Sequence, residues 1–189
     1  MEDSLEFDIT KYNQQKVHIQ GTKYIYRFCN DSEEYTGKVF YININKSNQN
    51  KFDEKISILK NTNYPTILKV FGYSLIKEED KSYPIIITEF MNRKSLDNLF
   101  YAASHSNMSK SFTDTKKYIA TIGVAYAIRF MHSKDLIHKN LRPSKILFDQ
   151  EYRPHVSYLD IILDPEEKQA TDLIYLAPEI FDDPQNYSK

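Results

Sequence analysis

The side chains with the clearest chemical character lie in residues 136–161. Asn140, Arg142 and Pro143 favour a tight turn there, because such residues interrupt regular backbone structure. Short apolar runs at residues 146–148 and 156–159 predict two strands separated by a second turn. Polar and charged side chains therefore gather in a loop beside a hairpin, where phosphoryl-transfer chemistry can be positioned.

This stretch resembles the catalytic loop and the metal-binding loop of protein kinases. In that family the pattern H-R-D-L-x-x-x-N is followed by a short hairpin and then by D-F-G. The matching residues here are His138-Lys139-Asn140-Leu141-Arg142-Pro143-Ser144-Lys145 and then Ser157-Tyr158-Leu159-Asp160, aligned without a gap. The resemblance implies that the two loops lie close together in the folded chain.

The resemblance also implies a role for each position, and the residues present do not suit these roles. Asn140 replaces the aspartate that accepts the substrate proton, and a neutral amide cannot act as a general base. Lys145 replaces the asparagine that binds the second magnesium, where a cation repels metal. Tyr158 replaces the D-F-G aspartate, and a phenol is a poor ligand for Mg²⁺. We therefore expect no metal site and no bound magnesium, although Arg142 keeps a cation near the transferred group.

Residues 17–45 resemble the first three strands of the kinase small lobe. Only Gly21 matches a glycine of the phosphate-binding loop, and the whole sequence contains four glycines. On this alignment Asn43 occupies the position of the strand lysine, and its short neutral side chain cannot reach the α- and β-phosphates. Lys23 or Lys38 could reach in from a neighbouring strand instead. These features predict a weakened phosphate site.

Residues 83–91 resemble the buried strand and hinge that hold the adenine ring in kinases. Thr88 would lie at the back of the nucleotide pocket, and backbone groups of Glu89 and Met91 would face the adenine. Because backbone contacts survive side-chain changes, this half of a nucleotide site can persist, and weak ATP binding is the one cofactor contact expected. A core strand without any ligand explains the same residues equally well.

Apolar spacing predicts two longer helices. The first covers residues 51–61, with Phe52, Ile56 and Leu59 at helical spacing. The second covers residues 113–132 and is apolar over much of its circumference. We expect the main stripe of the second helix to be buried, and it consists of Ile119, Ile122, Tyr126 and Phe130. A complete kinase domain has further helices after the motif matched by Ala177-Pro178-Glu179, and 189 residues do not contain them. We therefore also expect exposed apolar surface on this helix and a protein partner.

Composition limits the class of protein. The net charge of −1 gives no reason to expect nucleic-acid binding, and no apolar run is long enough to cross a bilayer. The single cysteine, Cys29, suits a reducing compartment, and the acidic N-terminal stretch lacks the apolar core of a signal peptide. These observations predict a cytoplasmic protein without membrane contact.

Together these observations predict an α+β, two-lobed protein kinase-like domain over residues 1–189. The antiparallel β small lobe would cover about residues 12–91, and a helical large lobe, truncated after the A-P-E motif, would cover residues 92–189. The favoured function is a catalytically inactive, pseudokinase-like module that binds or regulates a partner. Two alternatives stay open: an unconventional active ATP-dependent kinase of the serine/threonine type, and a partial kinase fragment without function.

Overall fold

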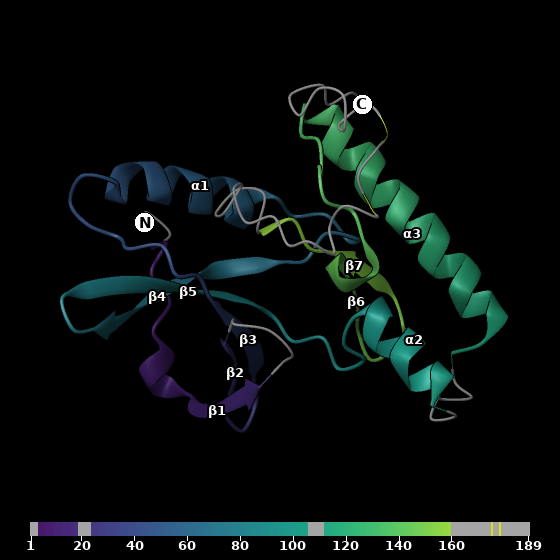
Figure 1. Ribbon diagram of the computed structural model, residues 1–189, viewed down its shortest axis with the longest axis horizontal. Helices are drawn as coiled ribbons and strands as arrows, with labels where there is room; N and C mark the ends of the chain where they lie inside the picture. The colour runs from purple at the N-terminus through teal and green to yellow at the C-terminus, as the bar shows by residue number, and fades with distance from the viewer. Residues whose placement is uncertain (1–3, 19–23, 106–111, 160–174, 176–177, 179–189) are drawn as a thin grey trace. The chain divides into compact units, whose positions relative to one another are not determined.

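The structure is a computed structural model, and it describes residues 4–18, 24–105, 112–159, 175 and 178 (Figure 1). The chain divides into two compact units. Unit 1 contains Met1–Asn63 and Lys69–Phe90, and unit 2 contains Tyr64–Leu68 and Met91–Lys189. Each unit is described by itself.

Unit 1 is built on a five-stranded antiparallel sheet with the order β1-β2-β3-β5-β4. The strands are β1 (Asn13–His18), β2 (Tyr24–Cys29), β3 (Glu34–Val39), β4 (Val70–Glu78) and β5 (Lys81–Glu89). Aromatic and β-branched residues dominate β2 and β5, which suits pleated, half-buried strands. With one helix packed on this sheet, the small unit has the predicted α+β architecture.

That helix is α1 (Gln49–Asn61), and it packs on one face of the sheet. Its buried residues are Phe52, Ile56 and Leu59, the apolar positions that the sequence pattern predicted. The Phe52 and Tyr73 rings meet edge to face with centroids 4.9 Å apart, so Tyr73 of β4 marks the face that α1 covers. The Tyr73 hydroxyl also donates a hydrogen bond of 3.0 Å to Asp53 of α1.

The N-terminal segment extends the sheet and then crosses its other face. The Phe7 N–H donates to the Tyr73 carbonyl over 2.7 Å, and the Tyr73 N–H donates to the Leu5 carbonyl over 3.0 Å. Residues 9–11 form a short 3₁₀ turn, η1 (Ile9–Lys11), and the chain then enters β1 at the opposite edge of the sheet. Phe7, Ile9 and Tyr12 pack on the buried side chains of this face, which include Phe28, Val39, Ile85 and Ile87.

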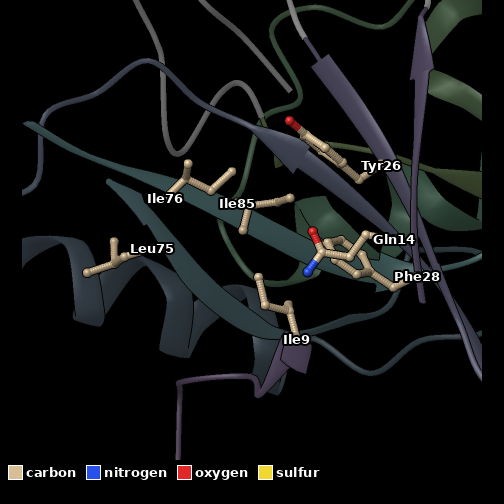
Figure 2. Close-up of a pocket in the computed structure, with 7 residues that line it drawn as sticks. All are labelled: Ile9, Gln14, Tyr26, Phe28, Leu75, Ile76 and Ile85. Carbon is tan, nitrogen blue, oxygen red and sulfur yellow. The ribbon is translucent and has the colours of Figure 1, made fainter. Parts of the chain in front are cut away.

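A hollow of about 290 Å³ lies on this second face of the sheet (Figure 2). Residues of η1, β1, β2, β4 and β5 line it. Its lining is mainly apolar and includes Ile9, Phe28, Ile76 and Ile85, with the Gln14 side chain as one polar group. Among the described residues, the side chains that line this hollow are uncharged.

Unit 2 contains two helices and a short hairpin. The elements are α2 (Leu96–Ser104), α3 (Asp114–Ser133), the 3₁₀ turn η2 (Pro143–Lys145), β6 (Ile146–Phe148) and β7 (Pro154–Val156). Thr113 caps α3, because its hydroxyl accepts a hydrogen bond from the Lys116 N–H. β6 and β7 pair antiparallel with Ile146 opposite Val156. β6 matches the first predicted strand, residues 146–148, whereas β7 ends at Val156, where the second predicted strand, residues 156–159, was expected to begin.

The orientation of α3 differs from the prediction. Its buried residues are Ala120, Gly123, Ala127 and Met131, a row of mostly small side chains. The predicted stripe lies largely in solvent, since Ile119, Ile122 and Tyr126 are exposed. The reason is the close approach of β7: a Cβ at Gly123 would lie 2.3 Å from Cγ of Pro154. Only small side chains allow this contact, so the bulky ones face outward, and the exposed apolar surface expected on this helix is present.

No helix in the described parts of the chain is both long enough and apolar enough to span a bilayer.

Candidate active site

The loop after α3 is joined to the hairpin by one buried contact. Nε2 of His138 lies 3.1 Å from the backbone oxygen of Ser157, and the His138 side chain is 4% exposed. Because a carbonyl oxygen can only accept, the imidazole donates from Nε2. This contact places the catalytic-loop match beside the D-F-G match, as the sequence resemblance implied.

Backbone hydrogen bonds hold the rest of the loop. The Asn140 N–H donates to the His138 carbonyl over 2.7 Å, and the Ser157 N–H donates to the Lys145 carbonyl over 2.8 Å. Between His138 and Asn140, Lys139 adopts a left-handed backbone conformation with φ of 56°, which is uncommon for a residue other than glycine. Ser157, the residue before Tyr158, therefore holds the loop at both ends, through His138 and through Lys145.

The two positions that hold metal in a working kinase are buried in unit 2. Tyr158 is 3% exposed and Lys145 is 9% exposed. A phenol and an ammonium group thus stand where a carboxylate and an amide would bind Mg²⁺. Within the described residues, no three His, Cys, Asp or Glu side chains lie close enough together to hold a metal ion.

Asn140 and Arg142 lie on the partly buried side of the same loop. Arg142 precedes η2, and its carbonyl accepts a hydrogen bond of 2.9 Å from the Lys145 N–H. The loop therefore presents an amide and several cations in the part of the molecule where the family pattern places a general base. Such a set can bind an anion, but it cannot take up a substrate proton near neutral pH.

The predicted hinge residues are split between the two units. Thr88 is buried in β5, opposite Thr36 of β3. Glu89 ends β5, and its carboxylate accepts a hydrogen bond of 2.8 Å from the Lys69 N–H. Met91 is buried at the start of the unit 2 segment, where its carbonyl accepts from the Lys94 N–H. The adenine-facing role of these residues stays a prediction.

Asn43 lies outside β3, which ends at Val39. Its amide oxygen accepts a hydrogen bond of 3.1 Å from the Ser82 N–H, and its carbonyl accepts one of 2.9 Å from the Asn48 side chain. Asn43 is exposed and joins the chain after β3 to the start of β5 and to the residue that precedes α1. The structure thus gives it a local structural role at the end of the sheet.

Lys38 is the cation that β3 places on the face covered by α1. It lies opposite Ile86, and Ile86 lies opposite Tyr73, whose ring contacts α1. Thr36, two residues away on the same face, lies opposite Thr88. Side chains of directly paired residues share a face of the sheet, so Lys38, Thr88 and the α1 contact are on one side. The sequence offered Lys38 only as one of two displaced lysines, and the strand register distinguishes it.

Four matched positions lie outside the described residues: Gly21 of the phosphate-loop match, Asp160 of the D-F-G match, and Ala177 and Glu179 of the A-P-E match. Lys23, the other lysine that the sequence offered, also lies outside them.

Comparison with known proteins decides the family. Residues 26–188 match the family described as protein tyrosine and serine/threonine kinase. The chain belongs to this kinase family. A cysteine-rich receptor-like protein kinase 7 of Arabidopsis thaliana is 22% identical over 68% of this chain and 20% of its own length. A probable serine/threonine-protein kinase of Dictyostelium discoideum is 26% identical over 76% of this chain and 14% of its own length. The kinase-family chain therefore spans a fifth or less of the length of these relatives.

Proposed function

We propose that this kinase-family chain acts as a catalytically inactive module that binds or regulates a protein partner. The observation that supports this proposal is the burial of Tyr158 directly after the Ser157 carbonyl that His138 contacts. The loop geometry of a kinase is thus present around a residue that cannot hold Mg²⁺. The same loop has Asn140 where proton transfer needs a carboxylate.

The size of the expected loss supports inactivity. Removing one preorganised electrostatic contact from an active site costs about 3–4 kcal/mol of transition-state stabilisation. Here three positions of the loop and hairpin have lost the groups that bind metal or accept a proton: Asn140, Lys145 and Tyr158. The contributions of catalytic groups that act together are not additive. Here, however, all three of these catalytic and metal-binding groups have been replaced, so none is left to keep part of the effect. We also propose weak ATP binding through the backbone near Glu89, without magnesium, and a cytoplasmic location.

One observation favours a second candidate, an unconventional active ATP-dependent kinase. Lys38 lies on the α1 face of the sheet, on the same side as Thr88. A lysine there can contact the phosphates of a nucleotide without help from Asn43. Under this alternative Lys38 supplies phosphate contact, while another group has to accept the substrate proton.

Phosphoryl transfer from radiolabelled ATP distinguishes the two proposals. The chain would be incubated with Mg²⁺ or Mn²⁺ and a general protein substrate, next to the variant Lys38→Met and the matched control Lys16→Met, which changes an exposed lysine of β1. We expect no transfer above a heat-denatured sample for any of the three proteins. Metal-dependent transfer that Lys38→Met abolishes and Lys16→Met preserves would establish the active-kinase alternative.

A further inference from the structure

The outward face of α3 is a contiguous apolar surface, here named the α3 stripe and defined by Tyr118, Ile119, Ile122, Ala125 and Tyr126. The exposed fractions of its four large side chains are 73% for Tyr118, 47% for Ile119, 55% for Ile122 and 49% for Tyr126. Spacings of three and four residues place them on one side of the helix. No charged residue occurs from 118 to 128. Single exposed apolar residues are ordinary, but a contiguous patch marks an interaction site.

The stripe is symmetric about Ile122. A tyrosine lies four residues before it and four after it, at Tyr118 and Tyr126. Three residues away, a large Ile119 on one side matches a small Ala125 on the other. When two such helices pack antiparallel with Ile122 against Ile122, Tyr118 of one faces Tyr126 of the other, and Ile119 faces Ala125. At the Ile119–Ala125 pairs a large side chain meets a small one, which favours close packing between the helices.

We propose that the α3 stripe binds the α3 stripe of a second copy of this chain, antiparallel, with a twofold axis at Ile122. The interface is isologous, because the same residues contribute from both copies. This inference does not depend on whether the chain transfers phosphate, since α3 lies outside the catalytic-loop match.

The charges at the two ends of the stripe favour the antiparallel arrangement. Asp114, whose side chain is 88% exposed, lies at the N-terminal end, and the exposed Arg129 lies at the C-terminal end. Antiparallel pairing brings Asp114 of each copy near Arg129 of the other, whereas parallel pairing aligns like charges. Lys117 is already paired with Asp114 within its own helix at 2.7 Å, so each end then holds two cations around one carboxylate. Helix dipoles also oppose each other favourably in this arrangement.

We expect a moderate affinity, because one helix face buries less than the ~800 Å² per partner of a standard interface. A dissociation constant on the order of 10 μM is consistent with this size.

Sedimentation equilibrium of the full chain tests the proposal. We expect the mass to rise with concentration from 22.3 kDa to twice that value. The variant Ile122→Asp places two carboxylates at the twofold axis and should remain monomeric throughout. Its matched control is Ile58→Asp, which introduces the same charge at the exposed Ile58 of α1 and should dimerise like the wild type. A wild-type chain that stays monomeric up to about 200 μM overturns the proposal, and so does a dimer that Ile122→Asp leaves intact.

Crosslinking tests the register in the same proteins, with Cys29→Ser as the background. Variants Ile119→Cys and Ala125→Cys would be treated with a short bis-maleimide, alone and mixed. We expect a crosslinked dimer from the mixture and much less from either variant alone, because residue 119 faces residue 125 of the other copy. Efficient crosslinking of Ile119→Cys with itself contradicts the antiparallel register. Equal melting temperatures of all variants would show that each result reports association and not unfolding.

Discussion

The imidazole of His138 donates to the backbone oxygen of Ser157, and this single bond joins the loop after α3 to the residue before Tyr158. The bond is buried, and it involves only a ring nitrogen and a main-chain oxygen. The bond itself therefore does not depend on the identity of the side chain at position 158. This explains how the loop geometry of a kinase can persist after the metal-binding carboxylate has been lost.

Replacing His138 with Phe should destabilise the chain by about 1–3 kcal/mol, because the ring volume is kept while the buried Ser157 carbonyl loses its donor. Urea unfolding followed by circular dichroism would measure the free energy of unfolding. His105→Phe, at an exposed position at the end of α2, is the control and should change it by less than about 0.5 kcal/mol. If His138→Phe is as stable as the wild type, the contact does not support the loop.

The stability of unit 1 should fall at alkaline pH because the Tyr73 hydroxyl ionises there. Burial first, and then the hydrogen bond and charge of Asp53, raise the pKa of Tyr73 to about 12. Because the folded-state pKa of Tyr73 lies above the unfolded value of about 10, the contribution of this side chain to the free energy of unfolding is fully present below pH 10. That stability is lost as pH rises from 10 through about 12, and we expect a loss of about 2 kcal/mol after allowing for solvent screening.

The variant Tyr73→Phe isolates this contribution. It should be less stable at pH 7 by about 1 kcal/mol, since Asp53 loses a donor, but its stability should decline less between pH 10 and pH 12 than that of the wild type. Tyr101→Phe, at an exposed position of α2, serves as control and should retain the wild-type decline. Parallel alkaline curves for Tyr73→Phe and the wild type would refute this assignment.

Gly123→Ala should destabilise α3 although alanine favours a helix. The gain in helix propensity is about 1 kcal/mol, but the added Cβ would lie 2.3 Å from Cγ of Pro154. Overpacking of this kind costs about 1–3 kcal/mol, so the net change should be a loss or, at best, zero. The difference between Glu54→Ala and Glu54→Gly, at an exposed position of α1 outside the α3 stripe, measures the propensity term alone. A variant Gly123→Ala that is more stable by the full propensity gain would show that β7 can move away.

Gly72→Ala should release the N-terminal segment from β4. Gly72 has φ of +152°, and a Cβ there would lie 2.3 Å from the Leu5 carbonyl oxygen. Hydrogen exchange of the Phe7 and Tyr73 amides, which pair across this edge, would report the release as faster exchange in both. Ser74→Ala in the same strand is the control and should leave both amides protected. Unchanged protection in Gly72→Ala would mean that the segment shifts without separating.

The sequence alone predicted the hairpin, the α+β class and the proximity of the two loop motifs, because these depend on local patterns and on motif spacing. It did not predict which side of α3 is buried. Apolar periodicity identifies the larger side chains, Ile119, Ile122 and Tyr126, whereas the close contact with Pro154 selects the smaller ones. That contact joins residues distant in sequence, so no local pattern contains it.

The sequence also did not predict which residue occupies the position of the strand lysine. Counting along the motif indicated Asn43, but β3 ends at Val39 and the register of β3 with β5 puts Lys38 on the α1 face. Register depends on the turn at residues 30–33 and on pairing with a strand about fifty residues away. A shift by one residue moves a side chain to the other face, so motif spacing alone cannot settle such a position.

Lys145 and Tyr158 stand where a kinase holds a divalent metal, and neither side chain suits that role. Thermal melting of the full chain with ATP, in EDTA and in Mg²⁺, measures whether a metal site remains. We predict the same melting temperature with ATP in both buffers, and a rise in Mg²⁺ only after the double substitution Lys145→Asn and Tyr158→Asp restores the metal-binding residue types. A magnesium-dependent rise in the wild-type protein with ATP would contradict the account.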